Sequence, residues 1–178
     1  STRQVKTLDD LKGIKLRFPT RLSGEALKLL GVNAIGMPVP QVPESLAQKV
    51  IDGCVVPWEV VPAIKAQELC KFHAEFPGTP TFYSATFVLV MNRAKYDSLS
   101  PAAKKVIDAN SGAPAAKMAG QAWDDAAVAV KKMVQDRGNT IVVISEDETK
   151  RWRQITRPVV DGWIQQSASK GFDGAKML

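Results

Sequence analysis

Arg17 is the side chain of this sequence best placed to bind a ligand. It lies near the end of a short strand-like run, 14–18, which Pro19 terminates. A guanidinium can hold both oxygens of a carboxylate with its planar fork of N–H donors, and α/β proteins bind ligands at the carboxyl ends of parallel strands. The pattern alone leaves open whether Arg17 binds a ligand carboxylate, forms an internal ion pair, or extends along the surface.

Cys54 and His73 are the pair that could carry nucleophilic catalysis, because a nearby base can activate a thiol. Cys54, however, precedes two valines and has no thiol-enzyme signature around it, while His73 lies in the mostly apolar run CKFHAEF. We therefore expect His73 to be a core or capping residue. Cys54 and Cys70 form neither a CxxC motif nor a Cys/His cluster, so we expect free thiols, with a disulfide left open, and no metal site.

Signatures of cofactor or nucleic-acid binding are absent from the sequence. Neither a P-loop nor a G-x-G-x-x-G motif occurs, and the paired acids fall at helix starts or turns. The formal net charge is +6 and the pI is about 9.4, but the Lys and Arg residues occur in ones and twos. The sequence thus predicts no cofactor and no nucleic-acid partner, while its positive charge favours small anionic ligands.

The elements that must position these residues alternate between strand and helix, which predicts an α/β fold. The run 14–18 is expected to be a strand, followed by a helix that Thr20 or Ser23 caps and Gly31 ends. The other expected elements are an extended proline-rich stretch (33–43), a short helix (43–51), an extended or strand segment (52–62), a helix (63–73), a strand (81–92), a helix (100–112), a long alanine-rich helix (114–137), a strand (140–145) and two helices (145–155 and 157–171).

Length and hydropathy are consistent with a chain that buries a core. The chain has 178 residues and is 45% hydrophobic. No apolar stretch approaches the roughly 20 residues of a membrane-spanning helix. The longest apolar run, Phe87–Met91, has the length of a strand, and its β-branched and aromatic composition favours that structure.

Four stretches of the chain together resemble the DctP-like solute-binding proteins of tripartite ATP-independent periplasmic (TRAP) transporters. They are LDDLKGIKLRFPT, GVNAIGMPVPQVPESLAQKVIDGCVVPWEV, MNRAKYDSLSPAAKKVID and KGFDGAKML, and their order and spacing match from Leu8 to Gly174. The resemblance implies a periplasmic-binding-protein-like fold of two α/β lobes with a long hinge helix. The chain opens as if in mid-protein, so we expect this fold to be incomplete, without the N-terminal lobe.

The resemblance also implies how the chain divides between the lobes. Residues 1–88 would form a second-lobe segment, 89–137 a first-lobe strand and helix with the hinge helix, and 138–178 the return to the second lobe. The strand around Phe87–Met91 would then pair with first-lobe strands. We expect the exposed apolar edge to need the missing lobe, a partner chain or swapping to stay soluble.

The family's ligand-contacting positions map onto five residues of this sequence. The arginine that clamps the ligand carboxylate maps onto Arg17, and the polar residue after the proline maps onto Thr20. Val39 occupies the proline-rich turn, and Val56 and Trp58 lie in the loop after the Asp-Gly pair. Val56 and Trp58 are apolar where relatives that bind polyhydroxylated acids have polar groups. Because a ligand hydroxyl without a partner is penalised, this departure favours an aromatic or 2-oxo/hydroxy monocarboxylate over sialic acid or a C4-dicarboxylate.

The resemblance therefore predicts a periplasmic binding protein, not an enzyme, which captures an organic acid and delivers it to the membrane components of a TRAP transporter. Two alternatives remain open at this point. One is a small α/β thiol hydrolase that uses Cys54 and His73. The other is a sensor module that uses the same binding lobes.

Overall fold

Strand β1 (Lys15–Phe18), which carries Arg17, lies in the middle of a three-stranded parallel sheet. In this computed structural model, which describes residues 1–78 and 81–178, its neighbours are β2 (Asn33–Gly36) and β3 (Gly53–Cys54), in the order β2-β1-β3. Arg17 stands opposite Ile35 on one side and Cys54 on the other. The expected strand at 14–18 is confirmed, and the extended proline-rich stretch begins as β2.

Helix α1 (Arg21–Leu29) follows β1 and starts at a capping box. The Thr20 side chain accepts a hydrogen bond from the Ser23 amide, and the Ser23 hydroxyl accepts one from the Thr20 amide at 3.1 Å. Thr20 is therefore the N-cap, one of the two residues expected there. Gly24 lies so close to Phe18 of β1 that a Cβ atom there would be 2.8 Å from the ring, so this glycine lets the helix pack onto its strand.

Two hydrophobic cores support the sheet. The first surrounds β1 and α1 and includes Ile14, Leu27 and Ile144, with Trp152 of the helix α7 (Glu146–Ser169) against it. The second lies under three short helical segments and receives buried side chains of the long helix α6 (Ala113–Asp136). The segments of this second core are η2 (Val39–Gln41), α2 (Val42–Ala47) and η3 (Trp58–Val60), and the buried α6 side chains are Val130 and Val134.

A second parallel sheet pairs β4 (Phe72–Glu75) with β5 (Thr140–Val143). The strand expected at 140–145 is confirmed, but the helix expected at 63–73 is wrong beyond its middle. The helix α3 (Ala66–Leu69) ends early, and the chain continues as β4. The backbone of 72–75 pairs in register with β5, a partner distant in sequence that local periodicity does not include.

The N-terminal residues connect the two sheets. The Ser1 nitrogen donates to the Phe72 carbonyl at 2.6 Å, and the Phe72 amide donates to the Ser1 carbonyl at 3.1 Å. The Thr2 amide donates to the Asp52 carbonyl, just before β3, at 2.8 Å. Backbone hydrogen bonds therefore continue from one sheet to the other through these two residues.

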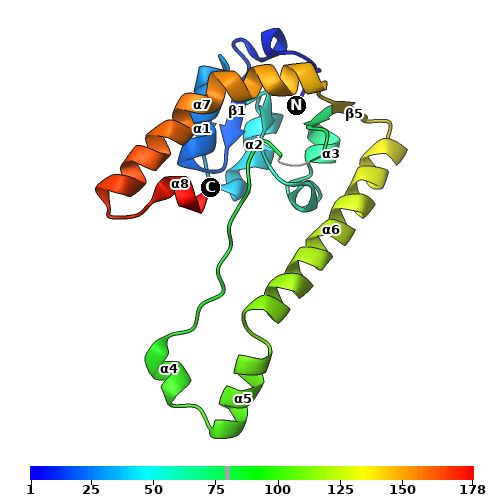
Figure 1. The fold of residues 1–178 in the computed structure, drawn as a ribbon. Helices are drawn as coiled ribbons and strands as arrows, with labels where there is room; N and C mark the ends of the chain where they lie inside the picture. Colours follow the sequence, from blue (N-terminus) through cyan, green and yellow to red (C-terminus); the bar gives the residue numbers. More distant parts are fainter. Residues whose placement is uncertain (79–80) are drawn as a thin grey trace.

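An arm of three helices extends away from the two sheets (Figure 1). It consists of α4 (Arg93–Asp97), α5 (Pro101–Ala109) and the distal part of α6 (Ala113–Asp136). Ser100 caps α5 through the Ala103 amide, as expected, and α6 confirms the long alanine-rich helix. The arm returns to the sheets where α6 enters the second core.

The strand expected at 81–92 is wrong. These residues run as an extended segment from the sheets to α4 (Figure 1) and form no ladder among the described residues. The apolar side chains of Phe87–Met91 are exposed, and Leu89 is completely so. A strand requires a neighbouring backbone for its N–H and C=O groups, and the described chain places none beside this segment.

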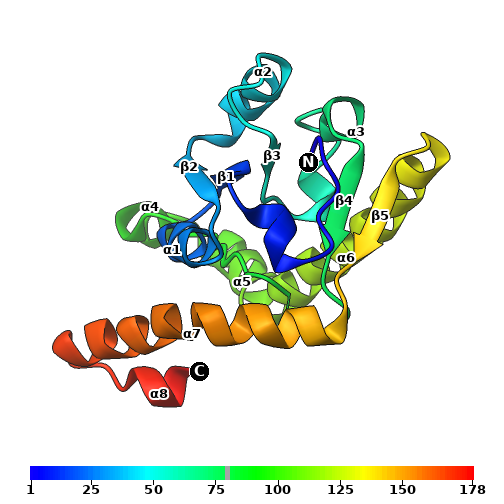
Figure 2. The ribbon, with the colours of Figure 1, turned by 90° about the horizontal axis from the view of Figure 1, so that it is seen from above.

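Helix α7 is continuous where two helices were expected. It starts at Ser145, which accepts from the Glu148 amide at 3.3 Å, and it includes Pro158. Figure 2 shows α7 along one side of the molecule with α8 (Gly174–Met177) folded back beside it. A Cβ atom on Gly174 would be 2.9 Å from Ser167, so this glycine permits the contact. Within the described residues, no helix combines the length and apolar character needed to span a bilayer.

His73 lies on β4, where its ring is enclosed by Trp58 and Asn139. The ring centroids of His73 and Trp58 are 5.5 Å apart, and His73 Nε2 is 3.3 Å from Asn139 Nδ2. Burial lowers the pKa of His73 from 6.5 to about 4. His73 is therefore a neutral packing residue, as the sequence predicted.

We expect His73 to make folding stability depend on pH in a defined range. Unfolded chains bind a proton at His73 near pH 6.5, whereas the folded chain binds it only near pH 4. The contribution of His73 to the free energy of unfolding is therefore fully present above pH 6.5 and decreases as the pH falls toward 4. Urea unfolding across this range should show a smaller decrease for His73→Gln than for wild type. An equal decrease in both proteins would contradict the assignment.

Candidate functional site

Arg17 is 5% exposed and is held between two backbone carbonyls. Its Nε donates to the Met37 carbonyl at 3.0 Å, and its Nη1 donates to the Val55 carbonyl at 3.1 Å. Met37 follows β2 and Val55 follows β3, so each strand beside β1 supplies one acceptor. The two bonds orient the guanidinium and use only part of its five N–H donors.

The charge of Arg17 is not neutralised by an ion pair with any residue in 1–78 or 81–178. Burial lowers the pKa of Arg17, and the nearby Cys54 and Tyr83 act in the opposite direction. A buried charge is costly when nothing compensates it. The arrangement can therefore accept an anion whose oxygens take the remaining donors.

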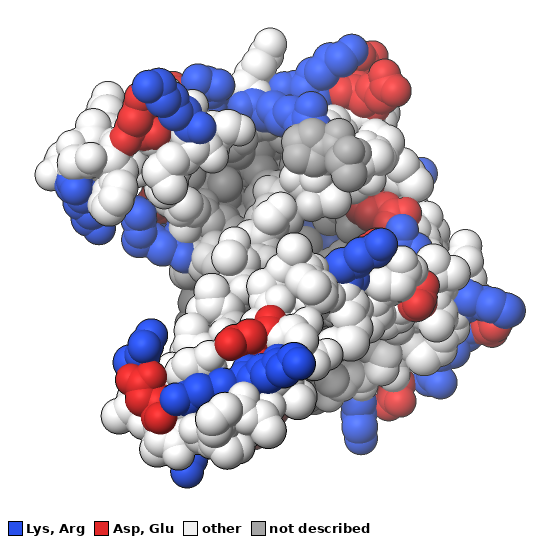
Figure 3. All heavy atoms as spheres, turned by 60° about the horizontal axis from the view of Figure 1, so that its bottom comes forward, with Lys and Arg blue, Asp and Glu red and all other residues white. Residues whose placement is uncertain are grey.

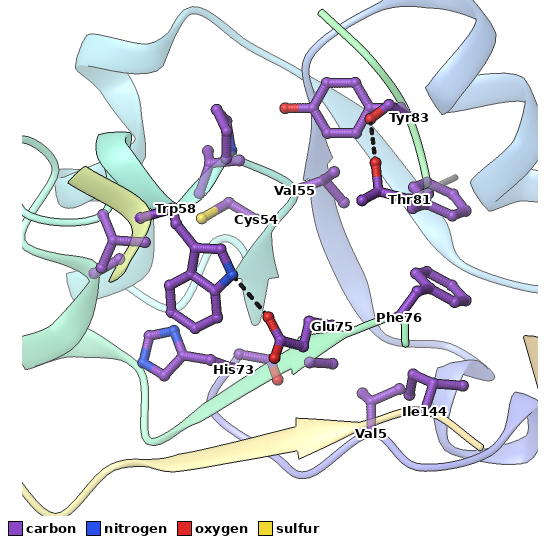
Figure 4. Close-up of a pocket in the computed structure, with 18 of the residues that line it drawn as sticks. Val5, Cys54, Val55, Trp58, His73, Glu75, Phe76, Thr81, Tyr83 and Ile144 are labelled. Atoms are coloured by element: carbon purple, nitrogen blue, oxygen red, sulfur yellow. Dashed lines mark hydrogen bonds between the residues drawn. The ribbon is translucent and has the colours of Figure 1, made fainter. Parts of the chain in front are cut away.

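An open cleft of about 830 Å³ lies where η3, β4, residues 81–85 and α6 come together, and Val55, whose carbonyl binds Arg17, is one of its lining residues. Figure 4 shows its labelled side chains, among them Val55, Trp58, Phe76 and Tyr83. Most of its lining is aliphatic or aromatic, which is the usual character of a small-molecule site. Representative lining residues are Val5, Cys54, Val55, Val56, Trp58, Glu59, His73, Glu75, Phe76, Phe82, Tyr83, Trp123, Asp124, Lys131 and Ile144.

The five predicted ligand-binding residues do not all line this cleft. Val56 and Trp58 do, and Arg17 adjoins it through its bond to the Val55 carbonyl. The exposed Thr20 uses its hydroxyl in the α1 cap, and Val39 packs against the second core. The ligand roles of all five residues therefore stay predictions, and those of Thr20 and Val39 have the weakest geometric support.

Tyr83 is a candidate that the sequence interpretation missed. It lines the cleft, its hydroxyl lies near Arg17, and burial raises its pKa. The sequence interpretation of 81–92 as a strand rested on the apolar run Phe87–Met91, which follows Tyr83. An available signal was the aromatic pair Phe82-Tyr83 among small polar residues, since tyrosine combines an apolar ring with a hydrogen-bonding tip.

The alternative thiol chemistry of Cys54 and His73 receives no support from their protonation states. Burial raises the pKa of Cys54 to about 11, and the pKa of His73 is lowered to about 4. At neutral pH both groups are uncharged, whereas an activated pair needs a thiolate. Cys54 and Cys70 are free thiols, and the described residues contain no cluster of possible metal ligands.

Charged side chains are mixed on the surface. Figure 3 shows Lys and Arg interspersed with Asp and Glu on the face that it presents, rather than gathered in one basic area. Many of the lysines and arginines are paired one helical turn away, as in Arg21–Glu25 and Lys132–Asp136. This distribution matches the scattered charge in the sequence and gives nucleic acid no continuous basic surface on that face.

Solved structures of high similarity are TRAP solute-binding proteins. One, from a marine metagenome and specific for aromatic acid ligands, contains 3-hydroxybenzoate; it is 41% identical with a TM-score of 0.92, over 98% of this chain and 54% of that chain. Another, from Rhodoferax ferrireducens, contains copurified benzoate; it is 39% identical with a TM-score of 0.92, over 97% of this chain and 54% of that chain. The present chain thus spans about half the length of these proteins.

A curated relative and a family model agree with these structures. The 2,3-diketo-L-gulonate-binding periplasmic protein of Escherichia coli is 39% identical over 102 residues, which are 57% of this chain and 30% of the relative. The model of the bacterial extracellular solute-binding protein family 7 (DctP) matches residues 1–166. As the resemblance predicted, the chain belongs to this DctP family of TRAP solute-binding proteins.

Proposed function

We propose that the protein containing this chain is a periplasmic receptor for an aromatic monocarboxylate, with Arg17 as the carboxylate anchor. The observation that carries the proposal is the buried guanidinium, oriented by two carbonyls and without an ion-pair partner among the described residues, beside a largely apolar cleft. The ligand carboxylate supplies the missing negative charge, and its two oxygens match the remaining N–H donors.

The lining of the cleft supports an aromatic ligand body. Trp58, Phe76 and Tyr83 contribute rings, and Val55 and Val56 contribute aliphatic surface. Aromatic rings pack well against each other in offset or edge-to-face arrangements. The benzoate and 3-hydroxybenzoate found in the two similar solved structures support the same class of ligand.

Delivery of the ligand to a transporter requires a protein that can close around the ligand, and two lobes allow this closure. In this proposal residues 1–88 and 138–178 belong to one lobe, and 89–137 supply first-lobe pieces and the hinge helix. The N-terminal lobe closes the other side of the cleft. Ligand that contacts both lobes favours the closed form by its differential affinity for that form, and the closed protein is what the membrane components of the TRAP transporter recognise.

Arg17→Ala should reduce ligand affinity strongly, because it leaves the ligand carboxylate buried without a partner. The expected loss is about 2–5 kcal/mol, which is roughly 30-fold to several-thousand-fold in Kd. Arg17→Lys should recover only part of the affinity, since an ammonium cannot form the two parallel bonds. Isothermal titration of benzoate into the complete protein that contains this chain measures both.

Arg21→Ala is the matched control for this experiment. Arg21 lies four residues later, on α1, with its side chain 58% exposed in an ion pair with Glu25. Exposed pairs of this kind contribute little to stability, so benzoate affinity should remain at the wild-type value. Wild-type affinity in Arg17→Ala as well would remove Arg17 as the anchor.

A panel of acids should separate the proposed ligand class from its competitors. We expect benzoate, 3-hydroxybenzoate and mandelate to raise the melting temperature of the complete protein, because bound ligand stabilises the folded state. Succinate, malate and sialic acid should have little effect, since their second carboxylate or hydroxyls would face valines and rings. Stabilisation by succinate or malate without a response to benzoate would overturn the assignment.

A further inference from the structure

Glu75 places a negative charge in a cleft for which we propose an anionic ligand. It is the last residue of β4, its side chain is 24% exposed, and it lines the same cleft as Trp58. A carboxylate at this position repels the carboxylate of an organic acid, unless another group neutralises it. The contacts of Glu75 show which side chain compensates its charge.

One oxygen of Glu75 has two partners from different elements. Glu75 Oε2 accepts a hydrogen bond from Trp58 Nε1 of η3 at 3.0 Å, and Figure 4 shows this bond across the cleft wall. The same oxygen forms an ion pair of 2.6 Å with Lys131 Nζ of α6. Lys131 Nζ also lies 5.4 Å from the centroid of the Trp58 ring. The three side chains therefore form one closed set of contacts.

Lys131 lies where α6 is anchored to the sheets. The adjacent Val130 and the following Val134 are buried in the second core, whereas Trp123 and Val128, earlier in α6, are exposed. The backbone at Lys131 is consequently fixed with respect to β4 and η3. Its ammonium approaches Glu75 from a rigid position, which is the condition for a partly buried ion pair to be effective.

We propose that Glu75 and Lys131 are positioning residues for the acid-binding cleft. Glu75 fixes the Trp58 indole in the cleft wall, and Lys131 neutralises Glu75 so that the wall does not repel a carboxylate ligand. This inference rests on the proposed function, because it assigns the pair a role in selecting anions. It predicts that the charge of the pair, apart from its packing, controls the preference for an acid over its neutral amide.

Lys131→Met, made in the complete protein that contains this chain, tests the electrostatic part of this proposal. The aliphatic body of the side chain remains, and Glu75 loses its counter-ion. Benzoate affinity should decrease roughly three- to tenfold, while affinity for benzamide, which has the same ring and no charge, should stay at the wild-type value. The benzoate loss should also shrink as salt is raised, because ions screen the unpaired carboxylate of Glu75.

Rescue and control variants separate charge from structure. Glu75→Gln keeps an oxygen that can accept from Trp58, so the double variant Glu75→Gln/Lys131→Met should return to near wild-type benzoate affinity. The double variant Glu75→Ala/Lys131→Met removes that acceptor together with both charges, so it should weaken benzoate and benzamide alike. Lys132→Met is the matched control, since Lys132 is 75% exposed and pairs with Asp136; it should change neither affinity.

The outcomes distinguish this inference from the proposed function. If wild type binds no aromatic acid, the proposed function fails, and the coupling of Glu75 and Lys131 is then measured by a double-mutant cycle in urea unfolding without ligand. Additive effects in that cycle would overturn the pair as a unit. If wild type binds benzoate but Lys131→Met loses benzoate and benzamide equally, or loses neither, the proposed function stands and the electrostatic role is wrong.

Discussion

The arrangement of this protein depends on accommodating one buried guanidinium. Arg17 stands on the central strand of a parallel sheet, and the carbonyls of Met37 and Val55, from the segments after the two flanking strands, hold it from both sides. Removing a cation from water is tolerable only when hydrogen bonds and opposite charge compensate it. The sheet supplies the hydrogen bonds, and the opposite charge is what the proposed ligand brings. In this proposal the guanidinium of Arg17 therefore both binds the sheet and selects the ligand.

The cleft beside Arg17 is assembled from elements that are far apart in the chain. Trp58 comes from η3, Glu75 from β4, Tyr83 from the segment after β4, and Lys131 from α6. Backbone bonds from Ser1 and Thr2 link the two sheets that carry these elements. The lining is largely apolar, and of the charged side chains in it, which include Glu59 and Asp124, Glu75 and Lys131 form an ion pair with each other.

Local sequence signals predicted the elements whose cause is local. Thr20 and Ser145 mark helix starts because their hydroxyls accept from amides three residues later, and the alanine-rich composition of α6 favours helix by itself. The errors have non-local causes. Phe72 and His73 belong to β4 because β5 lies beside them, and the apolar run Phe87–Met91 forms no strand because the described chain offers it no neighbour.

The sequence by itself determined the α/β class, the family, and Arg17 as the residue to follow, since these depend on motifs and order along the chain. Only the tertiary structure decided what surrounds that arginine. Two backbone carbonyls rather than carboxylates bind Arg17, Tyr83 lies near it, and Lys131 forms an ion pair with Glu75, which also binds Trp58. The physical reason is that electrostatic compensation acts over a few ångströms in space, and sequence spacing does not show which groups come that close.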